Sequence, residues 1–237
     1  MARALLGQNR LNFPRGGQAL PKVVYEDLAV FLANANVLLI PILSGWTEAV
    51  TGSGVTTQDV MRQTVTTGTT ASSTARRYVE ARGFGVDASA DWKFDFDKKT
   101  YLIFNYWRYQ TDAQVIARFQ LKEVTTEGAL AAKGFGLRAD NFALTGESYG
   151  TALGTVDLGV TITTDTYRRI LIIHDPSVPK IEFYVDGVLK GTQSTAANMP
   201  SGVAGVQSYL MHSIINGLAG GTNVQSAIMQ PRIWQAR

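Results

Sequence analysis

One stretch, Thr166–Gly191, constrains the fold more than any other part of the chain. Two apolar, β-prone runs in its second half are separated by Asp186-Gly187. Asp-Gly between such runs predicts a two-residue type I′ hairpin, because that turn requires positive φ at both central residues. The turn sets Val185 opposite Val188, so the register of the hairpin is well specified.

An earlier part of the same stretch predicts a third strand. Residues 170–173 are bulky and mostly β-branched, which suits a pleated surface. The following residues, 174–179, include Pro176 and Pro179, which cannot donate to a strand ladder. We therefore expect a strand, a loop over 174–179, and then the hairpin.

These residues carry a resemblance. Tyr-Arg-Arg-Ile at 167–170, His-Asp-Pro at 174–176 and Glu-Phe-Tyr-Val-Asp-Gly-Val at 182–188 resemble the late hairpin of concanavalin A-like lectin/glucanase domains, which include laminin G-like modules. The run at 227–235 is similar to the closing strand of such domains. The resemblance implies an all-β, concanavalin A-like jelly-roll β-sandwich. It says little about function, because this fold hosts glycosidases, lectins, adhesion modules and virion proteins.

The rest of the chain agrees with a sandwich. Residues 101–109 are apolar on both strand faces, which predicts a central strand, and 115–121 is expected to form a hairpin with it. Residues 92–96 alternate, which predicts a strand with its aromatic side chains inward. We predict an N-terminal extended arm at 1–21 and one domain at 22–237.

Composition limits the classes of site and partner. The chain has 0 Cys, so it has no disulfide framework and no thiolate metal site. The net charge is +3 with no run of basic residues, so we expect no nucleic-acid partner. The most apolar segment, 28–43, is too short for a confident membrane span and contains Pro41, so we expect no membrane association. No secretory signal is visible at the start, so we expect synthesis in the cytoplasm.

Catalytic chemistry is not expected. The resemblance to glucanases would imply carboxylates at alternating positions of one strand, since retaining hydrolysis needs two carboxyl groups about 5 Å apart. The nearest match is Asp95-Phe96-Asp97, which lacks a third acid and which we assign to a solvated strand end. His174 and His212 are expected to be local hydrogen-bonding groups. We therefore predict a protein that is not an enzyme, with no catalytic residues.

The sequence contains two candidate binding sites, one for calcium and one for a carbohydrate. His174-Asp175-Pro176 resembles part of a calcium loop, but the other acids are missing, so we predict no metal and no cofactor and leave calcium as an open alternative. Asn105, Trp107 and Tyr109 share a strand face and form a candidate carbohydrate-binding platform. The alternative for these three is the core or a subunit interface.

The first residues of the chain are expected to make contacts with other molecules. Residues 1–21 are interrupted by prolines and glycines, so they cannot continue a sheet of their own. Their bulky apolar and arginine side chains predict an intermolecular arm, and the alternative is a disordered terminus. The residues that we expect to make these contacts are Leu5, Leu6, Arg10, Leu11, Phe13 and Arg15.

These expectations lead to two functional hypotheses. The first is a non-enzymatic structural or decoration protein of a virus particle, expected to be a bacteriophage. It is expected to be made in the host cytoplasm, to form a homo-oligomer and to contact other virion proteins. Only 17% of the residues are charged, which suits a protein in an assembly. The alternative is a carbohydrate-binding module or phage adhesin that recognises a surface glycan.

Overall fold

The computed structural model describes most of the chain from Trp46 onward. The described residues are 46–58, 62–80, 94–109, 115–140, 143–204, 208–217 and 224–236. The predicted arm at 1–21 and its boundary with the domain at 22–237 lie outside these residues and stay predictions.

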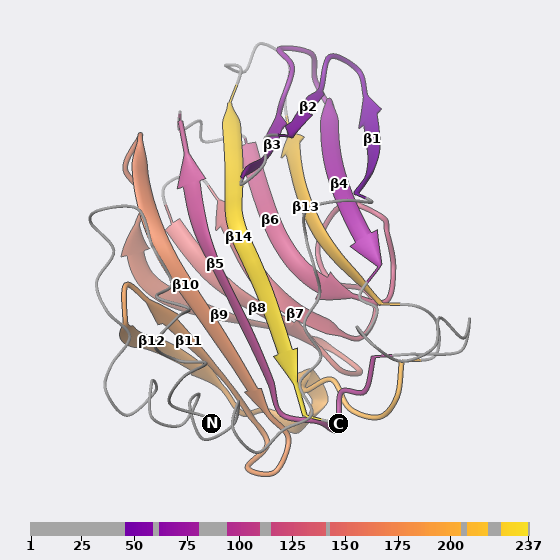
Figure 1. Ribbon diagram of the computed structural model, residues 1–237, viewed down its shortest axis with the longest axis vertical. Helices are drawn as coiled ribbons and strands as arrows, with labels where there is room; N and C mark the ends of the chain where they lie inside the picture. Colours follow the sequence, from indigo (N-terminus) through magenta and orange to yellow (C-terminus); the bar gives the residue numbers. More distant parts are fainter. Residues whose placement is uncertain are drawn as a thin grey trace, which may run out of the picture.

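The described residues form two seven-stranded antiparallel sheets that pack face to face, which confirms the all-β sandwich. In Figure 1, β5, β10 and β14 of one sheet pass in front of β6 to β9 of the other. Sheet A has the order β1 (Thr47–Thr51), β4 (Thr74–Glu80), β13 (Tyr209–Asn216), β6 (Val115–Lys122), β7 (Gly134–Asp140), β8 (Ala143–Tyr149), β9 (Leu153–Thr161). Sheet B has the order β12 (Val188–Gln193), β11 (Lys180–Val185), β10 (Thr166–Asp175), β5 (Thr100–Arg108), β14 (Gln225–Gln235), β3 (Arg62–Thr66), β2 (Val55–Gln58).

Helix plays a small part in the described chain. It contributes one 3₁₀ turn, η1 (Ala196–Asn198), to the residues that the structure describes. None of the described elements is a helix of the length and hydropathy that a bilayer crossing requires. The strands must therefore bury their apolar faces against each other.

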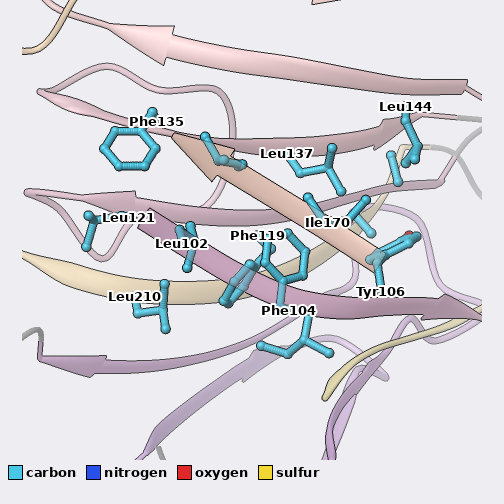
Figure 2. Close-up of a cluster of buried hydrophobic side chains, with 14 of the residues drawn as sticks. Leu102, Phe104, Tyr106, Phe119, Leu121, Phe135, Leu137, Leu144, Ile170 and Leu210 are labelled. Carbon is cyan, nitrogen blue, oxygen red and sulfur yellow. The ribbon is translucent and has the colours of Figure 1, made fainter. Parts of the chain in front are cut away.

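The core lies between the two inner sheet faces. Phe104 of β5 and Phe119 of β6 meet at its centre with ring centroids 4.3 Å apart (Figure 2). Alternation along β5 also sends Leu102 and Tyr106 inward, and all four side chains are buried. Full burial of each large apolar side chain contributes about 1.5–3 kcal/mol.

The Asp186-Gly187 hairpin has the predicted turn. Both central residues have positive φ, 51° for Asp186 and 82° for Gly187, and Val185 pairs with Val188. The Asp186 carboxylate also accepts hydrogen bonds from the Arg168 guanidinium and the Arg169 backbone N–H, both at 2.9 Å. The turn is therefore tied to the neighbouring strand β10.

The predicted hairpin between 101–109 and 115–121 is wrong. β5 pairs with β10 and β14 in sheet B, whereas β6 pairs with β13 and β7 in sheet A. Both strands carry bulky apolar side chains on their inner faces, and placing them in opposite sheets lets those faces pack on each other. The chain crosses from one sheet to the other between them.

Residues 92–96 do not behave as the predicted strand where they are described. Phe94 and Phe96 are fully buried, as expected, but Asp95 makes only an isolated bridge to Val203. The carboxylate of Asp95 accepts the Asp97 backbone N–H at 2.9 Å, which closes a turn. This side-chain hydrogen bond competes with strand pairing.

The predicted loop at 174–179 is shorter than expected. β10 continues through Asp175, so His174 lies within a strand and is fully buried beside the rings of Phe96 and Phe135. His212 is buried in the core, and its Nε2 lies 3.0 Å from the Ser226 hydroxyl. Burial lowers the pKa of His174 to about 4 and that of His212 to about 3.

We expect Gly187→Val to lower the free energy of unfolding by about 1–3 kcal/mol, because it forces a β-branched residue into positive φ. Urea unfolding measures the change. Thr192→Val is the control, since Thr192 is an exposed position of the same hairpin within strand β12. An equal effect of the two substitutions would contradict the type I′ turn.

The two buried histidines predict a loss of stability in acid. Their pKa is lower in the folded state than the ordinary value of 6.5, so the unfolded chain takes up protons first as the pH falls. Stability should be greatest above pH 6.5 and should fall toward pH 4, by about 1.4 kcal/mol per pH unit for each histidine. Urea titrations at pH 7.5, 6 and 5 measure this slope.

The control for the pH effect is the double variant His174→Phe with His212→Asn, which removes both titrating groups. Its stability should vary less between pH 6.5 and 5 than that of the native chain. The same slope in both proteins would show that other groups cause the pH dependence.

Candidate functional site on the outer face of sheet B

The predicted platform residues lie on the outer face of β5. Alternation sends Asn105 and Trp107 away from sheet A, and Tyr109 follows directly after the strand on the same face. The prediction that these three share a face is confirmed. The neighbouring strand β10 pairs Tyr167 with Trp107, which brings a further aromatic ring to this face.

Three rings form what we call the aromatic platform: Trp107, Tyr109 and Tyr167. The Trp107 and Tyr167 rings are stacked, with centroids 6.1 Å apart and planes inclined at 25°. The Trp107 and Tyr109 centroids are 5.8 Å apart at 36°. Tyr109 is 50% exposed and Tyr167 47%, whereas Trp107 is only 6% exposed. The tyrosines therefore present the accessible surface, and the tryptophan supports them.

Polar groups hold the tryptophan of the platform in place. The Trp107 indole Nε1 donates to the Asp165 carboxylate at 2.9 Å. Asp165 has φ 58° and is fixed by its own N–H, which donates to the Arg108 carbonyl at 2.9 Å. The Arg62 guanidinium lies over the Trp107 ring, 5.7 Å from its centroid, in cation–π geometry. A positive and a negative side chain therefore flank the rings.

Sequence reasoning missed three members of this site, namely Arg62, Asp165 and Tyr167. They lie on segments distant from β5 in the sequence and reach it only through strand order. Alternation along 167–173 places Tyr167 on one face with Leu171, and this can be inferred from the sequence alone. The pairing of β10 with β5 is the information that a single sequence lacks.

The outer face of sheet A carries a polar cluster around one carboxylate. Glu147 of β8 is buried, and its carboxylate accepts the Gln120 amide at 2.7 Å. Arg118 and Arg138 lie 3.4 and 3.6 Å from it. Gly136 stands between Gln120 and Glu147, where an added Cβ would lie 2.6 Å from the Gln120 Cα. Only glycine lets this hydrogen bond cross β7.

The connection between β6 and β7 lies across this same face. Lys122 donates to the Thr126 carbonyl at 2.7 Å, and burial lowers the pKa of Lys122 to about 8. Farther along the loop, Glu127 accepts a hydrogen bond from Thr74 at 3.2 Å and pairs with Arg76, both on β4. The loop therefore passes over β13, and its charged groups are paired with those of the sheet.

Acidic side chains near the sheet ends and in the hairpin have structural partners. Asp97 accepts the Gly202 backbone N–H at 2.7 Å, and Asp186 closes the hairpin turn. Glu182 pairs with Lys180 at 2.6 Å. Asp97 is exposed, as the prediction of a solvated position requires, but both carboxylates also accept backbone N–H groups, Asp95 from Asp97 and Asp97 from Gly202.

Metal ligands are not gathered in the described chain. No three His, Asp or Glu side chains are grouped among the residues described from 46 to 236. In the segment considered for calcium, the Asp175 carboxylate accepts two hydrogen bonds from Ser177 and lies 3.1 Å from the Lys99 ammonium. Burial tends to raise the pKa of Asp175, but these partners outweigh it, so the pKa is lower than usual. The Asp175 carboxylate therefore already has Ser177 and Lys99 as partners.

Comparisons with known proteins identify the fold. No family model matches the chain, and no curated protein is detectably similar to it. Among solved structures, a Shewanella oneidensis protein of unknown function has a TM-score of 0.55 at 12% identity, with 95% of this chain and 96% of that chain covered. A Bacillus licheniformis β-glucanase has a TM-score of 0.53 at 14% identity, covering 86% of this chain and 100% of that chain.

A third similar structure is the carbohydrate recognition domain of Emp47p. Its TM-score is 0.51 at 12% identity, and the match covers 83% of this chain and 90% of that chain. At such identities these likenesses establish the fold alone. The chain has the concanavalin A-like lectin/glucanase fold that the sequence resemblance implies.

We expect Asp165→Gly to lower the free energy of unfolding by about 1 kcal/mol, because the buried indole N–H of Trp107 loses its acceptor. Glycine keeps the positive φ without strain, so the change isolates the hydrogen bond. Asp165→Asn is the control, since it keeps an acceptor oxygen and also tolerates positive φ. Urea unfolding that ranks Asn below Gly would contradict the role given to this carboxylate.

Proposed function

We propose that this chain is a carbohydrate-binding module that stacks sugar rings on the aromatic platform. The observation that carries the proposal is the pair of half-exposed tyrosines, Tyr109 and Tyr167, on either side of the supporting Trp107. Binding requires no cofactor and no covalent step.

The chemistry of the platform suits a sugar. A sugar ring has a face of C–H groups that packs on an aromatic surface, and a rim of hydroxyls that needs hydrogen-bonding partners. The two tyrosines offer both an apolar body and a polar tip. Asp165 and Arg62 lie against Trp107, so an acceptor and a donor border the rings. A flat apolar surface with a few placed polar groups is the usual composition of a small-molecule site.

Binding without hydrolysis is part of the proposal. A retaining glycosidase needs two carboxyl groups about 5 Å apart, with one of them free to donate a proton. Glu147, the buried acid of sheet A, lies between the guanidinium groups of Arg118 and Arg138. Asp165 is held by the Trp107 indole. Both carboxylates are therefore engaged by structural partners.

A second candidate function, a structural or decoration protein of a virus (bacteriophage) particle, is favoured by the edges of the sheets. All four edge strands carry exposed apolar side chains, which are Val50 on β1, Val55 on β2, Leu153 on β9, and Val188 and Leu189 on β12. Exposed edges of this kind pair readily with other chains. The exposed edge strands could pair with other copies of this chain or with other virion proteins. The predicted arm at 1–21 would supply further contacts of this kind.

Glycan-array binding followed by calorimetry tests the proposed function. Tyr109→Ala and Tyr167→Ala should each weaken binding of the selected glycan at least tenfold, about 1.4 kcal/mol, because each removes a stacking surface. Leu189→Ala is the matched control, since Leu189 is similarly exposed on β12, away from the platform. The glycan should be recovered intact, with no new reducing ends.

Three outcomes separate the candidate functions. Unchanged affinity in the Tyr109→Ala, Tyr167→Ala double variant would place the glycan elsewhere. Release of new reducing ends would overturn the non-enzymatic part of the proposal. A chain that binds no glycan but sediments as a defined oligomer would favour the structural role.

A further inference from the structure

The two sheets meet at one side of the sandwich through their edge strands. β9 ends sheet A, β12 ends sheet B, and the two strands lie against each other (Figure 1). The contact is close at Gly191 of β12, where an added Cβ would lie 2.5 Å from the Cγ1 atom of Val156 in β9. Near the Asp186-Gly187 turn, a cleft of about 440 Å³ remains between β9, β10 and the hairpin. We call this cavity the edge cleft.

A bulge in β9 forms one wall of the edge cleft. Where β8 advances by two residues, β9 advances by four, from Asp157 to Thr161. The extra residues include Gly159, which has φ 58° and whose backbone N–H donates to the Asp157 carboxylate at 2.9 Å. Residues 159–161 line the cleft as a result.

A second bulge, in β12, brings a lysine to the other wall. Tyr184 pairs with Leu189 but Phe183 pairs with Gly191, so Lys190 is an extra residue with no partner across the ladder. Lys190 is exposed and lines the edge cleft. Bulges redirect side chains and are common beside functional sites. Two such bulges, one from each sheet, therefore face the same cavity.

The edge cleft carries an excess of positive charge. Arg168 and Lys190 line it, and Asp186 is the one acid among its described lining residues. The Asp186 carboxylate already accepts hydrogen bonds from the Arg168 guanidinium and the Arg169 backbone N–H, both at 2.9 Å. Lys190 makes no ion pair with any residue that the structure describes. Its ammonium is therefore available to donate to an anionic group of a ligand.

We propose that the edge cleft binds a hydroxylated carboxylate of the size of a single sugar ring, such as a hexuronate. Lys190 and Arg168 receive the carboxylate, and the hydroxyls of Thr161 and Thr163 exchange hydrogen bonds with those of the ligand. Valine side chains of β9 and the hairpin form an apolar wall for its C–H groups. The volume of the cleft suits such a ligand, since small-molecule sites typically measure about 300–1,000 Å³.

The edge cleft and the aromatic platform are different sites. Tyr167 belongs to the platform, whereas the next residue of β10, Arg168, lines the cleft. Alternation along β10 sends these two side chains to opposite faces of sheet B. The proposal for the cleft therefore does not rest on the function proposed for the platform.

Calorimetry of the full chain with D-galacturonate tests the proposal. D-galacturonate should bind at least tenfold more tightly than D-galactose, which lacks the carboxylate. Lys190→Gln should weaken the binding of D-galacturonate at least tenfold, because it removes a charged donor. Lys180→Gln is the matched control and should bind as the native chain does, since it removes the same charge at the end of β11 far from the turn. Equal affinity for the two sugars, or an equal loss in the two variants, would overturn the proposal.

A steric variant tests the location of the ligand without changing any charge. Val188 lines the edge cleft and is 52% exposed, so Val188→Trp should fill the cleft and abolish the binding of D-galacturonate. Leu189→Trp is the control, because Leu189 is similarly exposed on the same strand but does not line the cleft. Native affinity in Val188→Trp would show that the ligand lies elsewhere.

The Tyr109→Ala, Tyr167→Ala double variant separates this proposal from the proposed function. It should keep the native affinity for D-galacturonate even where it no longer binds the glycan of the platform. Loss of D-galacturonate binding in the double variant, with native affinity in Lys190→Gln, would assign this sugar to the platform and overturn the proposal. Absence of D-galacturonate binding by the native chain would overturn it as well.

Discussion

The sandwich depends on the burial of β5 on both of its faces. Its inner face supplies Phe104 to the centre of the core, and its outer face supplies Tyr101 and Ile103 to a second apolar cluster. A one-residue slip of β5 would exchange the two faces and place Asn105 in the core. Strands β10 and β14 hold the register from either side. The position of Trp107, and with it the aromatic platform, follows from that register.

Buried polar groups join the two layers and add directionality to the apolar packing. Arg108 of β5 is fully buried, and its guanidinium donates to the Val115 carbonyl of β6 at 3.0 Å, so it bridges sheet B and sheet A. The side chains of His212 in β13 and Ser226 in β14 meet across the same core. Such groups cost free energy when they are left unpaired, so they favour one alignment of the sheets over others.

How far the sequence predicts the structure depends on the range of each signal. The type I′ turn at Asp186-Gly187 was predictable, because its cause is the local φ requirement of two residues. The shared face of Asn105, Trp107 and Tyr109 was predictable from the strand period. The assignment of β5 and β6 to different sheets was not, since it is decided by packing between distant strands. Tyr167 and Asp165 were missed for the same reason.

The central positions of β13 and β14 have a consequence for synthesis on the ribosome. β13 separates β4 from β6 in sheet A, and β14 separates β5 from β3 in sheet B. Sheet A cannot close until β13 has emerged, and sheet B cannot close until β14 has emerged, so the facing edges of β4 and β6 and then of β5 and β3 stay unpaired until late in synthesis. A nascent chain of this topology is exposed to pairing with other chains until translation has passed residue 235. We expect the insertion of these two strands to be slow, because it joins segments far apart in sequence.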